Sequence, residues 1–252
     1  MSRKTLAASI LALGLTFAPA IATAGDGAAC AQEKATLQTV IDKHLKALGG
    51  RERLQAAKTF QLTALLKEGD KVTTSTIRRA RPNLMRTDVE GGGTRVSKVF
   101  DGQQGWKVEG TAAPQRLDAE TNAIVADTAS FDDVLMDPKA RGFTVTLAGV
   151  EEVEGAPAYK LVLTRGANSE IRLIDQERFL EVRRTYAGTY QGKAFRKTVS
   201  FFDYRAVDGI QVSHRTTWVS DDGEKGEKTV QSVRYDAPID AATFKPAAAP
   251  RS

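Results

Sequence analysis

The spacing of apolar residues changes once along this chain, close to Thr59. Within residues 34–48, apolar side chains recur at the i, i+3, i+4 positions that line one face of an α-helix. These positions are Leu37, Val40, Ile41, Leu45 and Leu48. Gly49 and Gly50 follow and predict the end of this helix, and residues 51–58 predict one further short helical turn. From Thr59 onwards the period becomes two, which is typical of strands that have one solvated face.

Alternating segments separated by glycine- and aspartate-containing turns fill most of the remaining chain. Pro82 predicts a bend or a sheet edge, because proline cannot donate a hydrogen bond to a strand ladder. The glycines at residues 91–93 predict a hairpin turn. The alternation predicts roughly ten or eleven strands, enough for a strongly curved antiparallel sheet or an open barrel. No strand–helix–strand rhythm is present, so a doubly wound fold is not expected.

Two stretches interrupt the alternation. Residues 110–127 contain Pro114 and several small residues, which predicts a long loop or a weakly helical lid. Residues 130–136 begin with Ser130 as a helix cap and have acidic residues in the first turn, which predicts a short amphipathic helix that ends before Pro138. Such a helix needs an apolar surface, so we expect it on the concave face of the sheet.

The first residues have the pattern of an export signal. Arg3 and Lys4 precede an apolar run, and Ala22-Thr23-Ala24 has the small-x-small pattern of a signal-peptidase site. Removal of residues 1–24 takes away these two positive charges and lowers the formal net charge from +5 to +3. A charge this small and evenly mixed gives no reason to expect nucleic-acid binding. No later stretch approaches the ~20 apolar residues that a membrane-spanning helix needs, so we expect a soluble mature chain.

The single cysteine, Cys30, lies shortly after this signal, so no intramolecular disulfide is possible. The preceding residues 27–29 lack the large aliphatic residue of a lipobox, and a lipid anchor at Cys30 is therefore not expected. The expected organisation is a signal peptide (residues 1–24), a flexible N-terminal segment (residues 25–33), a single domain (residues 34–246) and a disordered tail (residues 247–252).

The sequence lacks the short motifs of common enzyme sites. It has no G-x-S-x-G, H-E-x-x-H, C-x-x-C or Walker motif, and two histidines cannot supply a histidine-rich metal site. We interpret His44 as a boundary residue of the first helix and His214 as a hydrogen-bonded core residue. The carboxylate pairs at residues 132–133 and 221–222 fit a helix start and a turn better than acid–base catalysis. We expect no catalytic residue, metal or cofactor, although carboxylates that meet only in space leave a hydrolase open.

Three short motifs resemble one known family. They are Arg81-Pro82-Asn83-Leu84, the turn Phe100-Asp101-Gly102-Gln103-Gln104-Gly105-Trp106, and the segment Ile239-Asp240-Ala241-Ala242-Thr243-Phe244 near the C-terminus. In this order they resemble R-P-N-L, D-G-x-x-x-W and D-A-A-x-F of the periplasmic lipoprotein carriers of the LolA/LolB type. The resemblance covers most of the mature chain and implies a LolA-like half-barrel domain in the periplasm.

The resemblance implies an unclosed β-barrel whose concave face is covered by helices, with acyl chains bound between sheet and lid. In these carriers the arginine of R-P-N hydrogen-bonds lid backbone and helps to hold the empty cavity shut. That implies a lid-latch role for Arg81, whose guanidinium offers five donors in a fixed fork. The alternative is a solvated edge residue beside Pro82.

Alternation and the resemblance together suggest a set of aromatic residues that line a hydrophobic cavity. These are Phe60, Phe100, Trp106, Phe143 and Trp218. For each of them, ordinary core packing is the alternative.

The resemblance therefore predicts a monomeric carrier of lipoprotein acyl chains or another lipid in outer-membrane biogenesis, without a chemical step. Its partners would be that ligand and components of the inner or outer membrane. Residues 76–78 and 85–86 depart from the carriers, which tend to have aromatic residues there, so a related protein with a different hydrophobic ligand is also compatible. An envelope-stress sensory or regulatory module of the same fold, which binds a lipid or a partner protein, is the alternative.

Overall fold

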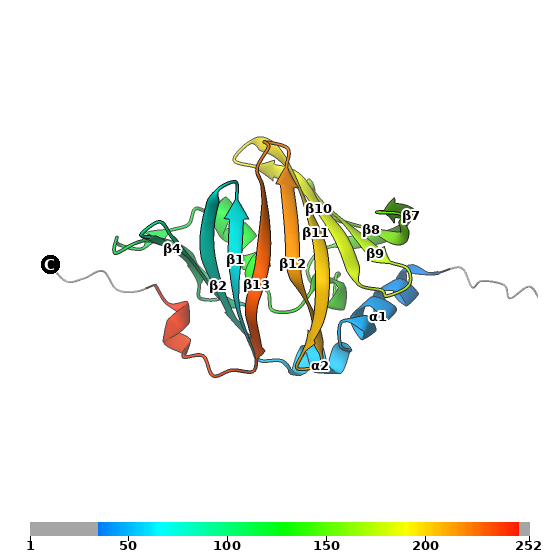
Figure 1. Cartoon of the computed structure of the whole chain (residues 1–252), viewed down its shortest axis with the longest axis horizontal. Helices are drawn as coiled ribbons and strands as arrows, with labels where there is room; N and C mark the ends of the chain where they lie inside the picture. Colours follow the sequence, from blue (N-terminus) through cyan, green and yellow to red (C-terminus); the bar gives the residue numbers. More distant parts are fainter. Residues whose placement is uncertain (1–34, 247–252) are drawn as a thin grey trace, which may run out of the picture. The chain divides into compact units, whose positions relative to one another are not determined.

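The period-two segments form one antiparallel sheet in the computed structural model, which describes residues 35–246 (Figure 1). Within these residues the sheet has thirteen strands, accompanied by three α-helices and two short 3-10 helices. The strands are β1 (Thr59–Glu68), β2 (Lys71–Ala80), β3 (Leu84–Gly91), β4 (Thr94–Phe100), β5 (Gly105–Glu109), β6 (Gln115–Arg116), β7 (Thr144–Val153), β8 (Ala156–Arg165), β9 (Asn168–Asp175), β10 (Glu181–Tyr190), β11 (Lys193–Val207), β12 (Ile210–Ser220) and β13 (Lys225–Tyr235). The helices are α1 (Leu37–Ala47), α2 (Arg51–Ala56), α3 (Ala119–Ala129), η1 (Val134–Met136) and η2 (Ala241–Phe244). The predicted signal peptide, Cys30 and the predicted tail lie outside the described residues.

The strand order is β6-β5-β4-β3-β2-β1-β13-β12-β11-β10-β9-β8-β7. Every neighbouring pair of strands is antiparallel. All pairs are also consecutive in sequence except β1 with β13, where Phe60 pairs with Tyr235. The order has two free ends, at β6 and β7, so the sheet is not closed. The structure has more strands than the predicted ten or eleven because β5 and β6, of five and two residues, are too short to show a period.

Residues 117–143 connect the two edge strands of the sheet, since β6 precedes them and β7 follows them. We call this connection the covering segment. It contains α3 and η1, and α3 lies behind the central strands in the view of Figure 1. The predicted loop or weakly helical lid at residues 110–127 is therefore in part β6 and the first turns of α3.

The predicted helix over residues 130–136 is wrong. Ser130 caps the C-terminus of α3, where its N–H donates to Ala126 and Asp127, and only the three residues of η1 are helical. Asp133 caps η1 and accepts a hydrogen bond from the Leu135 N–H at 2.8 Å. The extended backbone of Asp133 prevents a continuous helix, and its carboxylate is held by an arginine of the sheet.

Two apolar clusters attach the helices to the two sides of the sheet. In the first, Leu45 of α1 and Leu135 of η1 pack with Leu161 of β8. In the second, Val125 of α3 packs with Phe100 of β4. The clusters cover the flanks, and the predicted architecture of an unclosed curved sheet with helices on its concave face is confirmed.

Both histidines hydrogen-bond to backbone carbonyls. His44 is 1% exposed, and its Nδ1 lies 2.7 Å from the Phe179 carbonyl oxygen. The boundary position expected for His44 is therefore wrong, because the hydrogen bond lets the ring be buried; burial also lowers the pKa of His44. His214 is half-buried, with Nδ1 2.9 Å from the Val212 carbonyl oxygen.

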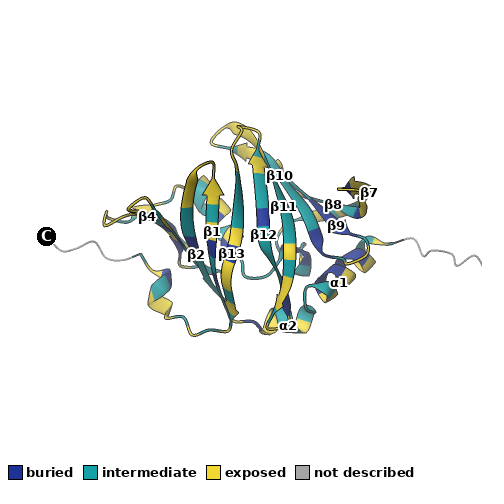
Figure 2. Ribbon diagram, viewed as in Figure 1, coloured by how far each residue is buried: buried dark blue, intermediate teal, exposed yellow. Residues whose placement is uncertain are grey.

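The central strands contribute little to either cluster. Strand β11 has no buried residue, β13 has only Val230, and β12 has Ile210 and Thr216. Figure 2 shows these strands mostly in the intermediate and exposed colours, whereas α1 and β9 carry dark buried positions. Within the described residues, the middle of the sheet has only a small buried cluster, Leu62, Ala64 and Val230, compared with the eight buried residues of the first cluster.

A buried carboxylate lies among arginines on β2, β3 and β4. Asp88 is 2% exposed and lies within 2.9–3.0 Å of nitrogens of Arg78, Arg86 and Arg95. The Ser97 hydroxyl donates to it at 2.6 Å. Burial by itself would raise the pKa of Asp88, but these hydrogen bonds and charges outweigh it and lower the pKa to about 2.

We expect Asp88 to contribute to acid stability over a defined pH range. Because its folded pKa is below its unfolded value, the contribution is complete above about pH 4 and is lost as the pH falls towards 2. Asp88→Asn should lower the free energy of unfolding at pH 7 by about 2 kcal/mol and flatten its dependence on pH between 4 and 2. Urea titrations at a series of pH values measure both. Asp70→Asn, at an exposed turn, is the control; equal acid limbs for all three proteins would contradict this prediction.

Candidate functional site

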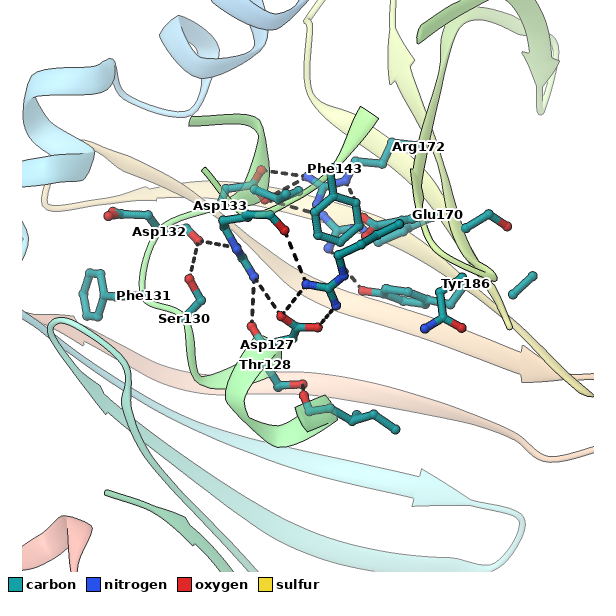
Figure 3. Close-up of a pocket in the computed structure, with 18 of the residues that line it drawn as sticks. Asp127, Thr128, Ser130, Phe131, Asp132, Asp133, Phe143, Glu170, Arg172 and Tyr186 are labelled. Atoms are coloured by element: carbon teal, nitrogen blue, oxygen red, sulfur yellow. Dashed lines mark hydrogen bonds and ion pairs between the residues drawn. The ribbon is translucent and has the colours of Figure 1, made fainter. Parts of the chain in front are cut away.

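Two adjoining pockets lie on the concave side of the sheet. The outer pocket, about 430 Å³, is lined by the covering segment and by residues of β8 to β11. The central pocket, about 370 Å³, is lined by the middle strands and the end of α1. Arg79, Asp133 and Arg184 line both pockets, so the two form one connected concavity. Figure 3 shows one of these pockets, with Asp127 to Asp133 on the side of the covering segment.

The central pocket has an apolar wall. Side chains from four strands form it: Phe60 and Leu62 of β1, Ile77 of β2, Phe201 of β11 and Tyr235 of β13. The Phe60 and Tyr235 rings contact each other with centroids 5.2 Å apart, as their paired positions in the register allow. Except for Leu62, these side chains are only half-buried, so apolar surface remains available to a ligand.

Arginines and carboxylates form an ionic network where the pockets meet (Figure 3). Arg172 of β9, whose side chain is 3% exposed, donates from Nη1 to both Asp133 carboxylate oxygens at 2.8 and 2.9 Å and from Nε to Glu170. Arg184 of β10 donates from Nε to Glu181 at 2.7 Å and lies 3.3 Å from Glu170 Oε1. Asp133 belongs to the covering segment and the other four residues to the sheet, so the network joins the two.

The network fixes the charge state of Asp133. Burial would raise the pKa of this carboxyl, but the positive charges of Arg172 and Arg184 outweigh burial and hold the pKa well below its usual range. A general acid needs a carboxyl group that keeps its proton near neutral pH. Asp133 is instead an ionised acceptor, suited to attaching the covering segment. Within residues 35–246 no group of three side chains suitable for a metal ion occurs.

Arg81 makes a second connection to the covering segment. Its two Nη atoms donate to the two carboxylate oxygens of Asp132 at 2.6 Å each, and its guanidinium lies 4.7 Å from the centre of the Phe131 ring. Its Nε donates to the Ala57 carbonyl oxygen at 2.7 Å, and Nη2 donates to that of Leu54 at 3.0 Å. Arg81 thus joins the turn after β2, the end of α2 and the covering segment.

A third connection starts from α3. The Arg165 guanidinium of β8 pairs with the Asp127 carboxylate and lies 4.5 Å from the centre of the Phe143 ring. Arg141 donates to the carbonyl oxygens of Asp127 and Asp132 at 3.2 Å each. Asp127, Asp132 and Asp133 of the covering segment therefore each pair with an arginine outside it.

The structure places the five aromatic residues suggested by the sequence in different environments. Phe60 lines the central pocket and Phe143 the outer pocket. Phe100 is buried beneath α3. Trp106 of β5 pairs in register with Val99. Trp218 contacts Gly226, with the Lys197 ammonium 5.3 Å from its ring centre.

Sequence reasoning missed the charged members of the site. Arg172 lies between Ile171 and Leu173, in the apolar run of β9 that ends at Ile174, and this position is the available sequence signal for a buried arginine. The sequence predicts a helix start at residues 132–133. Asp133 does cap η1, and in addition Asp132 and Asp133 pair with Arg81 and Arg172, which the sequence does not indicate.

No family model and no curated protein matches this sequence. Solved structures match its fold at low identity. A DUF1329 family protein from Desulfovibrio piger has a TM-score of 0.58 and 15% identity, over 82% of this chain and 96% of that chain. A LolA superfamily protein from Nitrosomonas europaea has a TM-score of 0.57 and 14% identity, over 84% and 98%.

A putative outer membrane lipoprotein-sorting protein domain from Vibrio parahaemolyticus has a TM-score of 0.57 and 10% identity, over 81% of this chain and 97% of that chain. Within the described residues, no helix is long and apolar enough to span a membrane. The unclosed sheet, the covering helices and these three structures together show that the chain has a LolA-like fold.

Proposed function

We propose that the protein is a periplasmic, monomeric carrier that encloses the acyl chains of a lipoprotein or another lipid between its central strands and its covering segment, with no chemical step. The observation that carries this proposal is the unfilled apolar wall of the central pocket. Phe60, Ile77, Phe201 and Tyr235 are half-buried there, although helices cover both flanks of the same sheet.

The outer pocket, although lined by many charged residues, also has exposed apolar side chains. Ile124 of α3 and Phe195 of β11 line it and are 45% and 40% exposed. Large apolar side chains around a pocket are a recurrent feature of sites for hydrophobic ligands.

The energetics suit a ligand that is shielded and then released. Each buried methylene contributes roughly 0.8 kcal/mol, whereas a hydrogen bond contributes about 1 kcal/mol net. A single long acyl chain can therefore offset the loss of several contacts that hold the covering segment. A carrier needs this near balance between open and closed states.

The test is uptake of an acylated peptide by protein made with its N-terminal signal in a bacterial periplasm and purified without detergent. We expect co-purified lipid or saturable uptake, measured by native mass spectrometry and lipid extraction. Ile77→Lys should reduce uptake at least tenfold by introducing a charge into the apolar wall. Val72→Lys on the same strand, at a side chain that is 54% exposed, should not. Protein without lipid that takes up no acylated peptide would rule the proposal out.

A further inference from the structure

Two cations in the central pocket differ from the other charged residues of the site. Arg79 of β2 and Lys228 of β13 line the central pocket. Within residues 35–246 neither side chain makes an ion pair or a hydrogen bond, and the Nε of Arg79 is buried without a partner. By contrast, Arg81, Arg172 and Arg184 are each paired with carboxylates.

On one side the two cations have apolar neighbours. On the other side the nearby carboxylates are already paired with arginines. Strand β1 lies between β2 and β13, and its Phe60 pairs in register with Arg79. The carboxylates that also line the central pocket are Asp133 and Glu181, and the network arginines occupy both. No acidic side chain of the pocket is therefore left to neutralise Arg79 and Lys228.

The protonation behaviour agrees with this placement. Burial lowers the pKa of Arg79, and burial together with the charge of Arg79 lowers the pKa of Lys228. The two positive groups are thus close enough to disfavour each other. An anion between them would supply the missing hydrogen-bond acceptors and the missing opposite charge at once.

We propose that Arg79 and Lys228 form an anion subsite in the central pocket, which binds the carboxylate or phosphate group of an acyl-chain ligand whose chain lies against the apolar wall. This inference rests on the proposed function and adds the class of ligand, an acidic amphiphile. Arg79 also lines the outer pocket, so the subsite can be reached from the side on which Ile124 and Phe195 are exposed.

The test compares dodecanoate, dodecyl phosphate and dodecanol, which share a chain length and differ in the head group. Each displaces a fluorescent apolar probe from the full mature protein, below its micellar concentration. We expect at least one of the two anions to bind about tenfold more tightly than dodecanol, as one charge-assisted hydrogen bond allows. The Arg79→Met/Lys228→Met variant should bring this ratio close to one. Lys71→Met, an exposed cation on the same strand as Arg79, should keep it.

The outcomes separate the subsite from the proposed function. Equal affinities for all three ligands in the unaltered protein, or an unchanged ratio in the double variant, would overturn the subsite while leaving an apolar carrier. Binding of none of the three would overturn both. The two anions themselves distinguish a carboxylate from a phosphate as the preferred group.

Thermal unfolding of the protein without ligand is an independent test of the subsite. A buried cation without a partner destabilises the fold, and an apolar side chain of similar length removes that cost. Arg79→Met should therefore unfold at a higher temperature than the unaltered protein. A lower unfolding temperature would identify Arg79 as a structural residue and overturn the subsite.

Discussion

Replacement of Arg172 by methionine is expected to destabilise the protein by about 3–5 kcal/mol, because it leaves buried carboxylates without their counter-charge. Arg172 donates to Asp133 and Glu170, and its own side chain is 3% exposed. Once it is removed, Arg184 alone faces Asp133, Glu170 and Glu181. Urea unfolding at pH 7 measures the change.

The matched control is Arg205→Met. Arg205 also pairs with a carboxylate, Asp203, but its side chain is 62% exposed. Exposed pairs contribute little because water screens them, and this variant should unfold almost as the unaltered protein does. Equal losses of stability in the two variants would show that the buried network has no special role.

The second expected result concerns exchange of the ligand. Arg81→Leu removes the contacts with Asp132, Ala57 and Leu54 together. The Arg81–Asp132 pair is about one-third exposed, so we discount its charge and attribute about 2 kcal/mol to the lost hydrogen bonds as a group. This corresponds to roughly thirtyfold faster release of a bound acyl probe. Stopped-flow release into excess vesicles measures the rate.

Companion variants test whether this effect comes from the Arg81–Asp132 pair. Asp132→Asn keeps the backbone contacts of Arg81 and should accelerate release less, and the double variant should show non-additivity, as expected for residues in contact. Lys139→Leu removes an exposed charge from the covering segment itself and should leave release unchanged. Release from Arg81→Leu at the rate of the unaltered protein would return Arg81 to the role of a residue at the sheet edge.

The spacing of apolar residues predicted individual helices and strands, but it failed where contacts between distant residues determine the structure. The helix at residues 37–47 and most strands follow from apolar spacing, because each buries one face. The pairing of β1 with β13 has no local signal, since it joins the two ends of the domain. The helix expected at residues 130–136 does not form, because the ion pair of Asp133 with Arg172 outweighs helix propensity.

The candidate site was predictable only in part for a related reason. Arg81 stood out because three motifs placed it in a known pattern. Arg79 and Lys228 belong to strands whose alternation gives no indication of whether a charged side chain faces solvent or a cavity. The register of β1 places Arg79 opposite Phe60 and Lys228 opposite Leu66, on the same face of the sheet. Only the curvature of the folded sheet brings both to one pocket.

The covering segment is attached at both ends to opposite edges of the sheet, through β6 and β7. A lid with one hinge can swing away from its cavity, but a strap with two fixed ends cannot. Its middle can rise only if the sheet bends less and its edges move apart, or if the strap itself unwinds. In the proposed carrier, entry of a bulky ligand is therefore coupled mechanically to the curvature of the whole sheet.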